Sequence, residues 1–480
     1  MRISSFAFVS FAFVTMFAAL ALSGFHIPRS AAPAPPPEQT YTTYCAGCHG
    51  EKVEAFVDRQ WKYGTGRAEL VKSITHGYPD NGMPAWGKVL KPAEVEALAA
   101  LIGKHIESGK KYIAADKPTS NIFAAADLTV RLDTVAVGLD SPWGRALLPG
   151  GEMLVTDRAG QLYRLGADRR RTPVQGVPAV VAEGQGGLLD VVLHPAFATN
   201  RFVYLSYSAP KDENGEKQAT TAVLRARLDG DRLTDHKVIF EARPYATTRH
   251  HYGSRMVFGP DGFLYVSVGD RGREKENPQS LESDCGKVHR LRDDGTAPPD
   301  NPFAGQGAAH ASVYSYGHRN PQGIAVNPAT GTVWTHEHGP RGGDEVNIVR
   351  KGKNYGWPVI SYGINYDGTT FTNATAKAGM EQPLHYWIPS IAPSGMAFVS
   401  GDRYKAWKGN LLVGSLRFQY LNRCVLAGEK IVKEEILLKN VGRVRNVTMA
   451  PDGYLYVAVE QPGAVYRLLP VEAGKVGLKQ

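Results

Sequence analysis

From about residue 128 to residue 470, apolar and polar residues alternate in short runs that turn residues interrupt. The clearest run, Met256–Gly269 (MVFGPDGFLYVSVG), recurs almost residue for residue at Val447–Val459 (VTMAPDGYLYVAV). Alternation with a period of two predicts strands, and Pro, Asp and Gly between two such runs predict a tight turn. Each copy therefore predicts a β-hairpin.

Four looser copies of this hairpin pattern begin near Ala146, Val191, Ile324 and Met396. The six copies together give roughly 57 residues per repeat, enough for four strands with long insertions. Radial repetition of four-stranded sheets is the arrangement of a β-propeller, whereas a β-sandwich requires no such self-similarity. The sequence thus predicts a mainly β chain with a six-bladed propeller over residues 128–470.

A helical pattern replaces this alternation in the residues before the propeller. Lys91–Ile102 has a proline in its first turn, and apolar residues then recur every three or four positions, at Val95, Leu98, Ala99, Ile102 and Ile106. We expect a small all-α domain over residues 41–115, a linker at 116–127 before the propeller, and a short tail at 471–480.

The first 24 residues have the composition of an export signal. Arg2 precedes an apolar run from Phe6 to Leu22, and a Pro-rich linker follows at 25–40. The run of 17 residues is slightly long for a cleaved signal peptide and slightly short for a spanning helix, so cleavage and retention as a membrane anchor both stay open. Both a cleaved signal peptide and a retained anchor would place the folded part in the periplasm. An anchor would in addition associate the protein with the membrane.

The formal net charge of +9 is spread along the 480 residues, and no run of Lys and Arg is longer than Arg169–Arg171. Nucleic-acid-binding proteins concentrate positive charge in a patch, so we expect no nucleic acid partner. The surplus suits an anionic partner instead, such as a phospholipid surface, an acidic redox protein or an acidic cofactor.

The string Cys45-Ala-Gly-Cys48-His49 carries the strongest chemical signal in the chain. Two thiols that bind the porphyrin and an imidazole that ligates the iron are what covalent attachment of haem c requires. A zinc site would need a second pair of ligands, and the only other cysteines are Cys285 and Cys424. Those two could pair in an oxidising compartment or remain free buried thiols.

A methionine downstream of the haem motif, Met83, lies in a short loop punctuated by Pro and Gly. His/Met ligation of haem c requires such a residue, with His76 and His105 as the competing sixth ligands. Trp61 and Trp86 are available to enclose the haem. The whole stretch resembles a class I cytochrome c, which implies that the protein transfers electrons.

Four stretches of the propeller region are polar where strand patterning does not require it. In the last of them, period-two spacing places Arg443 and Arg445 on one side of a strand, and two cations that face the same way indicate an anionic ligand. The stretches are His250–Arg255, Gly317–Gly323, Glu337–Glu345 and Val441–Arg445.

These strings also carry a family resemblance. The motifs His-x-Gly-Ser-Arg, Gly-His-Arg-Asn-Pro-Gln-Gly, His-Gly-Pro-x-x-Gly-Asp-Glu-Val-Asn and Asn354-Tyr-Gly-Trp-Pro358 occur here in family order. They resemble the soluble aldose dehydrogenases that depend on pyrroloquinoline quinone, in the glucose/sorbosone dehydrogenase family. The resemblance covers residues 128–470 and implies a six-bladed propeller. It also implies oxidation of aldoses at the anomeric carbon, with the quinone and calcium as cofactors.

The resemblance assigns roles to residues of the first two motifs. His251, rather than its neighbour His250, would be the general base that takes the proton of the anomeric hydroxyl, and alternation along an extended segment would point the two imidazoles in opposite directions. Arg319 would polarise the quinone carbonyl that receives the hydride. Asn320 and Gln322 would contact cofactor or substrate.

The remaining implied residues would bind the cofactors. The main-chain oxygens of Gly339 and Pro340 would ligate the calcium, an ion that readily accepts carbonyl ligands. Cations suit a tricarboxylate, and arginine binds carboxylates with two parallel hydrogen bonds. Arg417 and Ser390 stand where the family has a lysine and a threonine, which keeps the charge and the hydroxyl but changes the shape of the cation. The quinone-binding residues are expected to be Ser390, Arg417, Arg443 and Arg445.

The favoured hypothesis is an enzyme that passes electrons from sugar to quinone, then to the fused haem c, and finally to a downstream acceptor. That acceptor would be another cytochrome, a quinone or an oxidase. A calcium-dependent propeller hydrolase such as a lactonase is the second hypothesis, and it should lack both the paired arginines and the haem. A non-catalytic propeller that docks the cytochrome is the third.

Overall fold

The computed structural model describes residues 34–49, 53, 61–108, 117–272, 275–460 and 462–471. The described residues from Pro36 onward belong to one compact unit. The predicted signal or anchor at 1–24, most of the Pro-rich linker and nearly all of the tail at 471–480 therefore lie outside the described residues. No helix of the described part is long and apolar enough to cross a membrane.

The small domain that precedes the propeller consists of short helices, as predicted. Its first helix begins within the segment expected to be a linker, because Pro37 at its first turn has the fixed φ that starts a helix. The elements are α1 (Pro37–Tyr44), α2 (Ala46–His49), α3 (Arg67–His76), α4 (Pro92–Glu107) and the 3₁₀ turns η2 (Pro79–Asn81) and η3 (Trp86–Lys88).

The longest helix, α4, has the predicted start and the predicted apolar stripe. The main-chain N–H of Lys91 donates to Oε2 of Glu94 at 2.7 Å, a side-chain cap for the first turn. The buried residues of the helix are Val95, Leu98, Ala99 and Ile102. They form one core with residues of α3 and η3, among them Leu70, Ile74 and Trp86.

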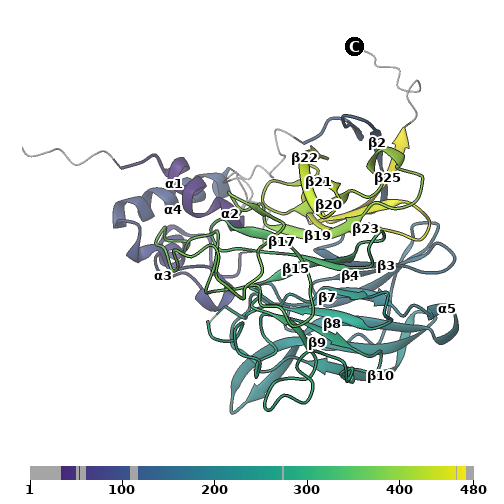
Figure 1. The fold of residues 1–480 in the computed structure, drawn as a ribbon. Coiled ribbons are helices and arrows are strands. Elements are labelled where there is room, and N and C mark those ends of the chain that lie inside the picture. The colour runs from purple at the N-terminus through teal and green to yellow at the C-terminus, as the bar shows by residue number, and fades with distance from the viewer. Residues whose placement is uncertain are drawn as a thin grey trace, which may run out of the picture. The chain divides into compact units, whose positions relative to one another are not determined.

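Six antiparallel sheets follow, which confirms the predicted propeller (Figure 1). The first three blades consist of β3 (Pro142–Leu147), β4 (Met153–Asp157), β5 (Gln161–Leu165) and β6 (Arg171–Pro173); β7 (Leu188–Leu193), β8 (Phe202–Glu213), β9 (Glu216–Asp229) and β10 (Arg232–Glu241), with the short helix α5 (Phe197–Asn200) between β7 and β8; and β11 (Met256–Phe258), β12 (Leu264–Val268), β13 (Lys287–Leu291) and β14 (Val313–Tyr316).

The other three blades complete the propeller. They consist of β15 (Pro321–Val326), β16 (Val333–Glu337), β17 (Asp344–Ile348) and β18 (His385–Trp387); β19 (Pro393–Phe398), β20 (Leu411–Ser415), β21 (Tyr420–Ala427) and β22 (Lys430–Leu437), with the 3₁₀ turn η4 (Lys405–Trp407); and β23 (Arg443–Met449), β24 (Leu455–Glu460) and β25 (Ala464–Val471) together with β2 (Thr129–Ala136) and β1 (Ile122–Ala124).

Each hairpin repeat of the sequence is the pair of innermost strands of one blade. The six pairs are β3–β4, β7–β8, β11–β12, β15–β16, β19–β20 and β23–β24. The first strand of one pair packs beside the first strand of the next, as β3 does with β7, β15 with β19 and β19 with β23. The repeats were detectable because these strands are buried on both sides, and such positions accept few residue types.

The last blade joins the two ends of the propeller sequence. β2 pairs with the C-terminal strand β25, with Thr129 opposite Val471 and Thr134 opposite Tyr466. The short strand β1 then pairs with β2 inside the segment expected to be a linker, where Phe123 packs against the core of the blade. Three residues are too few to show a period of two, which is why the sequence pattern did not reveal this strand.

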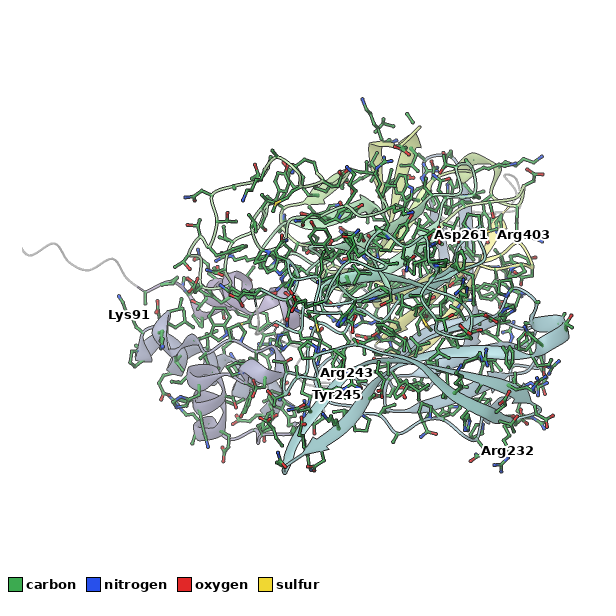
Figure 2. All side chains as sticks on the ribbon, turned by 60° about the horizontal axis from the view of Figure 1, so that its bottom comes forward. Lys91, Arg232, Arg243, Tyr245, Asp261 and Arg403 are labelled. Atoms are coloured by element: carbon green, nitrogen blue, oxygen red, sulfur yellow. The ribbon has the colours of Figure 1, made fainter. Side chains whose placement is uncertain are left out.

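Charged side chains divide between the outer surface and the centre of the propeller. Arg232 and Arg403 are exposed at the periphery of the propeller, and Lys91 is exposed on the helical domain (Figure 2). Asp190 and Arg255, in contrast, are 6% and 3% exposed and lie on the innermost strand β7 and just before the innermost strand β11.

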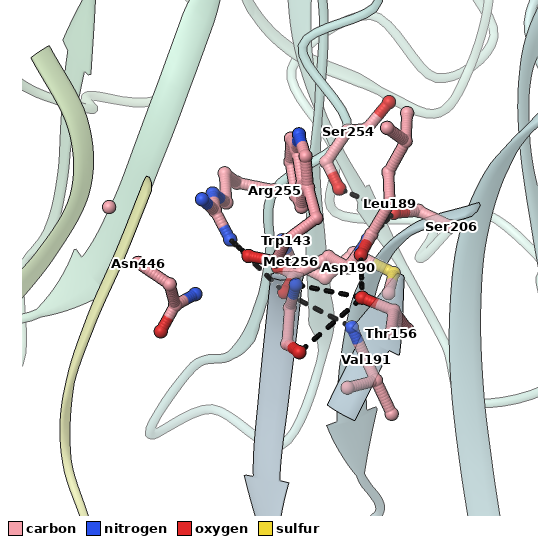
Figure 3. A network of polar contacts seen from close by, with 12 residues as sticks. Trp143, Thr156, Leu189, Asp190, Val191, Ser206, Ser254, Arg255, Met256 and Asn446 are labelled. Carbon is pink, nitrogen blue, oxygen red and sulfur yellow. Dashed lines mark hydrogen bonds and ion pairs between the residues drawn. The ribbon is translucent and has the colours of Figure 1, made fainter. Parts of the chain in front are cut away.

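A buried polar network surrounds Arg255 (Figure 3). Its guanidinium lies 3.4 Å from Asp190 Oδ1, donates to the main-chain oxygens of Trp143, Gln322 and Arg445, and stacks on the Trp143 ring at 3.7 Å. Burial raises the pKa of Asp190, although Arg255 opposes that shift. The network therefore ties five of the six blades together at the centre of the ring.

Replacing Asp190 by Ala should lower the free energy of unfolding by about 3–5 kcal/mol, because it leaves the charge of Arg255 buried without its acidic partner. Asp402→Ala is the matched control, since Asp402 pairs with Lys408 on the surface and exposed pairs contribute little. Denaturant unfolding followed by fluorescence measures both variants. Equal midpoints for the two would contradict a central role for the network.

Candidate active site

The polar stretches singled out in the sequence converge on one pocket of about 1000 Å³. All the propeller residues expected to bind or react, except Asn320, line it: His251, Arg319, Gln322, Gly339, Pro340, Ser390, Arg417, Arg443 and Arg445. Asn320 is fully buried beside it, where its Oδ1 accepts a hydrogen bond from the main-chain N–H of Gly253 at 3.1 Å and its Nδ2 has no partner among the described residues.

His251 is held by a carboxylate that the sequence analysis did not single out. Asp270 Oδ1 lies 2.6 Å from His251 Nδ1, and the indole N–H of Trp357 donates to Asp270 Oδ2 at 2.7 Å. The main-chain N–H of His251 donates to Gln185 Oε1 at 2.9 Å. Asp270 therefore fixes the ring through Nδ1, and Nε2, which has no hydrogen-bond partner among the described residues, is left for chemistry.

The electrostatic surroundings keep His251 neutral. Burial and the nearby charge of Arg319 lower the pKa of His251 to about 4. Burial alone would raise the pKa of Asp270, but His251 and Arg319 hold it below its ordinary value. The pair is thus a neutral imidazole beside a carboxylate. Such an imidazole can accept a proton, and the carboxylate then stabilises the positive charge of the ring.

The backbone at His251 corrects one expectation. An extended segment would point the rings of His250 and His251 in opposite directions, but φ is +54° at His251 and +76° at Ser254, so the segment is not a strand. The two rings meet edge to face with their centroids 4.6 Å apart. Positive φ at a non-glycine residue costs free energy, and such strain is concentrated at functional sites.

His250 has different surroundings from His251. Its Nδ1 lies 3.4 Å from the main-chain oxygen of Asp80, in the loop that precedes Met83. Burial and the neighbouring His251 lower the pKa of His250 to about 3. His250 is therefore a packed, neutral side chain that does not line the pocket.

Arg319 lies between the base and the predicted calcium ligands. Its Nη1 donates to the main-chain oxygens of His338 at 3.1 Å and Gly339 at 2.7 Å, and its buried Nε has no partner among the described residues. Its main-chain N–H donates to Glu337 Oε2 at 2.5 Å. The carboxylate of Glu337 also binds His318 Nδ1 at 2.9 Å, so a buried network fixes the segment between β14 and β15 that carries Arg319.

The two carbonyls expected to bind calcium border the pocket close to an acidic side chain. Gly339 O accepts from Arg319, and Pro340 O lies 3.4 Å from the hydroxyl of Ser390. Asp344 accepts from the main-chain N–H groups of Gly339 and Ala392, each at 2.8 Å, and burial raises its pKa to about 6. No cluster of three or more His, Cys, Asp or Glu able to hold a metal occurs within the described ranges.

Glu460 holds the two arginines of β23 and is a second residue that the sequence analysis missed. It accepts from Arg443 Nε at 3.1 Å and from Arg445 Nε at 2.7 Å. Burial would raise the pKa of Glu460, but the charges of Arg445 and Arg443 hold it far below its ordinary value. Glu460 neutralises one of the two arginine charges, so this part of the pocket still carries a net positive charge. The half-buried side chain of Arg158 adds a further positive charge.

A signal for these missed carboxylates is present in the sequence. Asp270 and Glu460 both stand at the end of the second strand of a repeat, after VSVG and YVAV. A charged residue that follows a fully buried strand needs an oppositely charged or hydrogen-bonding partner where the strand ends. Asp270 has His251 as its partner, and Glu460 has Arg443 and Arg445. Arg417, by comparison, lies where expected and donates to the main-chain oxygen of Ser390 at 3.3 Å.

The predicted haem residues occupy the helical domain. His49 ends α2 and donates its main-chain N–H to Cys45 O at 2.9 Å. Cys45, Trp61 and Met83 pack against the same hydrophobic core, and Trp86 belongs to it. The side chain of Cys48 lies outside the described part.

The backbone around Met83 forms a closed loop. The N–H of Met83 donates to Tyr78 O at 3.1 Å, and the N–H of Tyr78 donates to Met83 O at 2.9 Å. The competing ligands His76 and His105 lie in the last turns of α3 and α4. Asn81, two residues before Met83, borders the same pocket as His251.

Cys285 and Cys424 are free thiols, each fully buried, in different blades. Burial raises the pKa of the Cys285 thiol to about 11 and that of Cys424 further still. Of the two alternatives that the sequence left open, the structure shows the buried free thiols.

Comparison with known proteins agrees with this geometry. A family model described as Glucose / Sorbosone dehydrogenase matches residues 139–467. The chain belongs to this family. A model described as Cytochrome C oxidase, cbb3-type, subunit III matches residues 32–102, which supports the cytochrome c domain.

Individual relatives cover the propeller. The aldose sugar dehydrogenase YliI of Escherichia coli (strain K12) is 42% identical over 73% of this chain and 96% of its own length. A crystal structure of a glucose dehydrogenase is 44% identical, with a TM-score of 0.68 over 72% of this chain and 99% of that one. The PQQ-bound aldose sugar dehydrogenase of Streptomyces coelicolor is 30% identical, with a TM-score of 0.61 over 72% and 99% of the two chains. The chain is therefore an oxidoreductase, and the hydrolase and docking-module hypotheses lose their support.

Proposed function

We propose that this enzyme oxidises aldose sugars at the anomeric carbon to lactones, uses pyrroloquinoline quinone bound in the pocket, and passes the electrons to a haem c in its own N-terminal domain. The observation that carries the proposal is the convergence of one neutral histidine and several arginines on a single pocket. The named activities of the relatives, an aldose sugar dehydrogenase and a PQQ-bound one, support it.

The pocket suits a tricarboxylate quinone in charge and in size. Arg319, Arg417, Arg443 and Arg445 line it, and a cavity of about 1000 Å³ has room for the cofactor and a sugar. Arg319 Nε and Asn320 Nδ2 are buried donors without partners among the described residues, and buried donors are normally paired. A bound acceptor-rich molecule would satisfy them.

His251 would take the proton of the anomeric hydroxyl at Nε2, and Asp270 would stabilise the charge that the ring then acquires. When bound, the quinone supplies the two-electron acceptor for the hydride that leaves the sugar. Arg319 would place a fixed positive charge where negative charge develops, which is worth most in a site shielded from water. The carboxylates of the cofactor would also offset the charge of Arg319, which now lowers the pKa of His251.

Calcium is the proposed metal, held by the carbonyls of Gly339 and Pro340. The positive charge of the ion would add to that of Arg319 beside the reacting carbonyl. Asp344, at the same rim, would supply negative charge that the carbonyls lack, and a nearby divalent ion would keep its carboxyl ionised.

Haem c in the N-terminal domain is the proposed electron acceptor, with Cys45 and Cys48 as covalent attachment points and His49 and Met83 as axial ligands. The short sequence distance between Asn81 at the pocket and Met83 in the haem loop supports direct transfer. The composition of the first 24 residues supports export to the periplasm, where haem c is attached. A downstream cytochrome, quinone or oxidase would then receive the electrons.

The purified full-length protein, with its haem attached and supplied with the quinone and calcium, should show haem reduction when an aldose is added in the absence of oxygen. Chelation with dialysis should abolish that reduction and release the quinone, and calcium should restore both better than magnesium, which accepts irregular carbonyl cages poorly. The haem absorption bands and quinone fluorescence report the two events. Haem reduction that persists after exhaustive chelation would show that the reaction does not need the metal.

His251→Gln should lower kcat by about 10²–10⁴-fold, the usual contribution of a general base, while the quinone still binds. His250→Gln should change dye-linked turnover far less, because its ring does not line the pocket. The base must be neutral, and burial and Arg319 lower the pKa of His251 to about 4, so kcat/KM of the wild type should hold through mildly acidic pH and fall as the pH approaches about 4. Equal losses in the two variants would overturn the assignment.

Met83→Ala should change the haem spectrum and lower the reduction potential, because thioether ligation raises it. Met153→Ala is the control: Met153 is buried in the propeller core, so its loss should reduce stability and leave the spectrum unchanged. An unaltered spectrum in Met83→Ala would assign the ligand to His76 or His105.

A further inference from the structure

Lys287, at the start of β13, is a charged side chain that the proposed mechanism does not use. It is 0% exposed, and lysine is almost never fully buried unless it is paired. No ion pair within 4.0 Å involves it in the described ranges; the interactions that oppose the effect of burial on its pKa come from Cys285 and then Asp284. Burial lowers the pKa of Lys287 to about 7.

Three main-chain carbonyls surround the ammonium group. Nζ donates to Asn277 O at 2.7 Å, Pro278 O at 3.1 Å and Cys285 O at 2.7 Å. An ammonium has three donors, so all three are used. A cage of carbonyl oxygens is also what proteins present to hard metal cations, and here the chain supplies the cation itself.

The carbonyls belong to the two ends of one segment, Asn277–Cys285, which the lysine therefore closes into a loop. Both ends of that loop support the segment between β14 and β15 that carries Arg319. Pro278 O, besides Lys287, accepts the N–H of Gly317 at 2.8 Å, and Gly286 O accepts the N–H of His318 at 3.1 Å.

The same loop supports the base through a second route. Gln279 Nε2 donates to the main-chain oxygen of Trp357 at 2.7 Å. The indole of Trp357 binds Asp270, and Asp270 binds His251. The Arg319 guanidinium also lies 5.2 Å from the centre of the Trp357 ring.

We propose that Lys287 is a positioning residue for the active site, a built-in cation that closes the loop on which both Arg319 and the Asp270–His251 pair depend. Its role follows from the carbonyl cage and the two hydrogen-bonded routes. The cage itself is independent of the proposed function, whereas the effect on catalysis rests on it.

Lys287→Ala tests the proposal because it leaves three carbonyls around a space from which an ammonium has been removed. Turnover should fall by about 10- to 100-fold, since a shift of about 1 Å in a positioned group can cost that much. Ammonium or potassium ions should restore a large part of it. Quinone affinity should fall far less than turnover, because Arg417, Arg443 and Arg445 belong to other blades.

Two readouts do not depend on the loaded enzyme. Ammonium should raise the thermal midpoint of the quinone-free Lys287→Ala protein, and rubidium soaked into its crystals should give an anomalous peak at the cage. Lys287→Met fills the same space without charge, so no ion should rescue it. Lys211→Ala, on the exposed surface beside Glu213, controls for loss of a lysine.

The outcomes separate the cage from the catalysis. Full turnover in Lys287→Met, or no response of Lys287→Ala to any cation in either readout, overturns the proposal. If the wild type oxidises no aldose but the thermal midpoint of Lys287→Ala still responds to ammonium, the proposed function fails and the cation cage stands.

Discussion

The pairing of β2 with β25 is the constraint on which the rest of the propeller depends. The other five blades are each formed by consecutive strands, but the sixth needs residues 129–136 and 464–471 together. Only a closed ring brings the ends of the innermost strands together around one centre. Residues at or next to those strand ends line the pocket. A site with His251, Arg319 and Arg445 on three different blades exists only because that one pairing closes the circle.

Within the ring, burial determines the charge state of the site as much as the identity of its residues does. His251 stays neutral because it is buried beside Arg319, and Asp270 stays ionised because both neighbours favour its charge. Glu460 offsets part of the charge of Arg443 and Arg445 and fixes their direction. The arginines are therefore held in place before any anion arrives, which reduces the cost of ordering them on binding.

The sequence predicted the propeller, its six repeats and the helical domain, because those features repeat or follow a period. It also predicted which strings would converge, although the positions of Asp270 and Glu460 were missed. Both are single acidic residues at strand ends, and only their spatial partners distinguish them from solvated rim residues. The segment around His251 was misread as extended because a positive φ at a histidine leaves no trace in composition. Strand β1, with three residues, was too short to show a period.

Closure of the last blade also orders the assembly of the protein in time. In a chain synthesised from its N-terminus, the helices between residues 37 and 107 emerge before the strands of the propeller. Strand β2 emerges shortly afterwards with only the three-residue strand β1 to pair with, and its other partner, β25, follows more than three hundred residues later. The N-terminal helices can therefore fold while the propeller is still open, and the pocket forms only when the last blade closes.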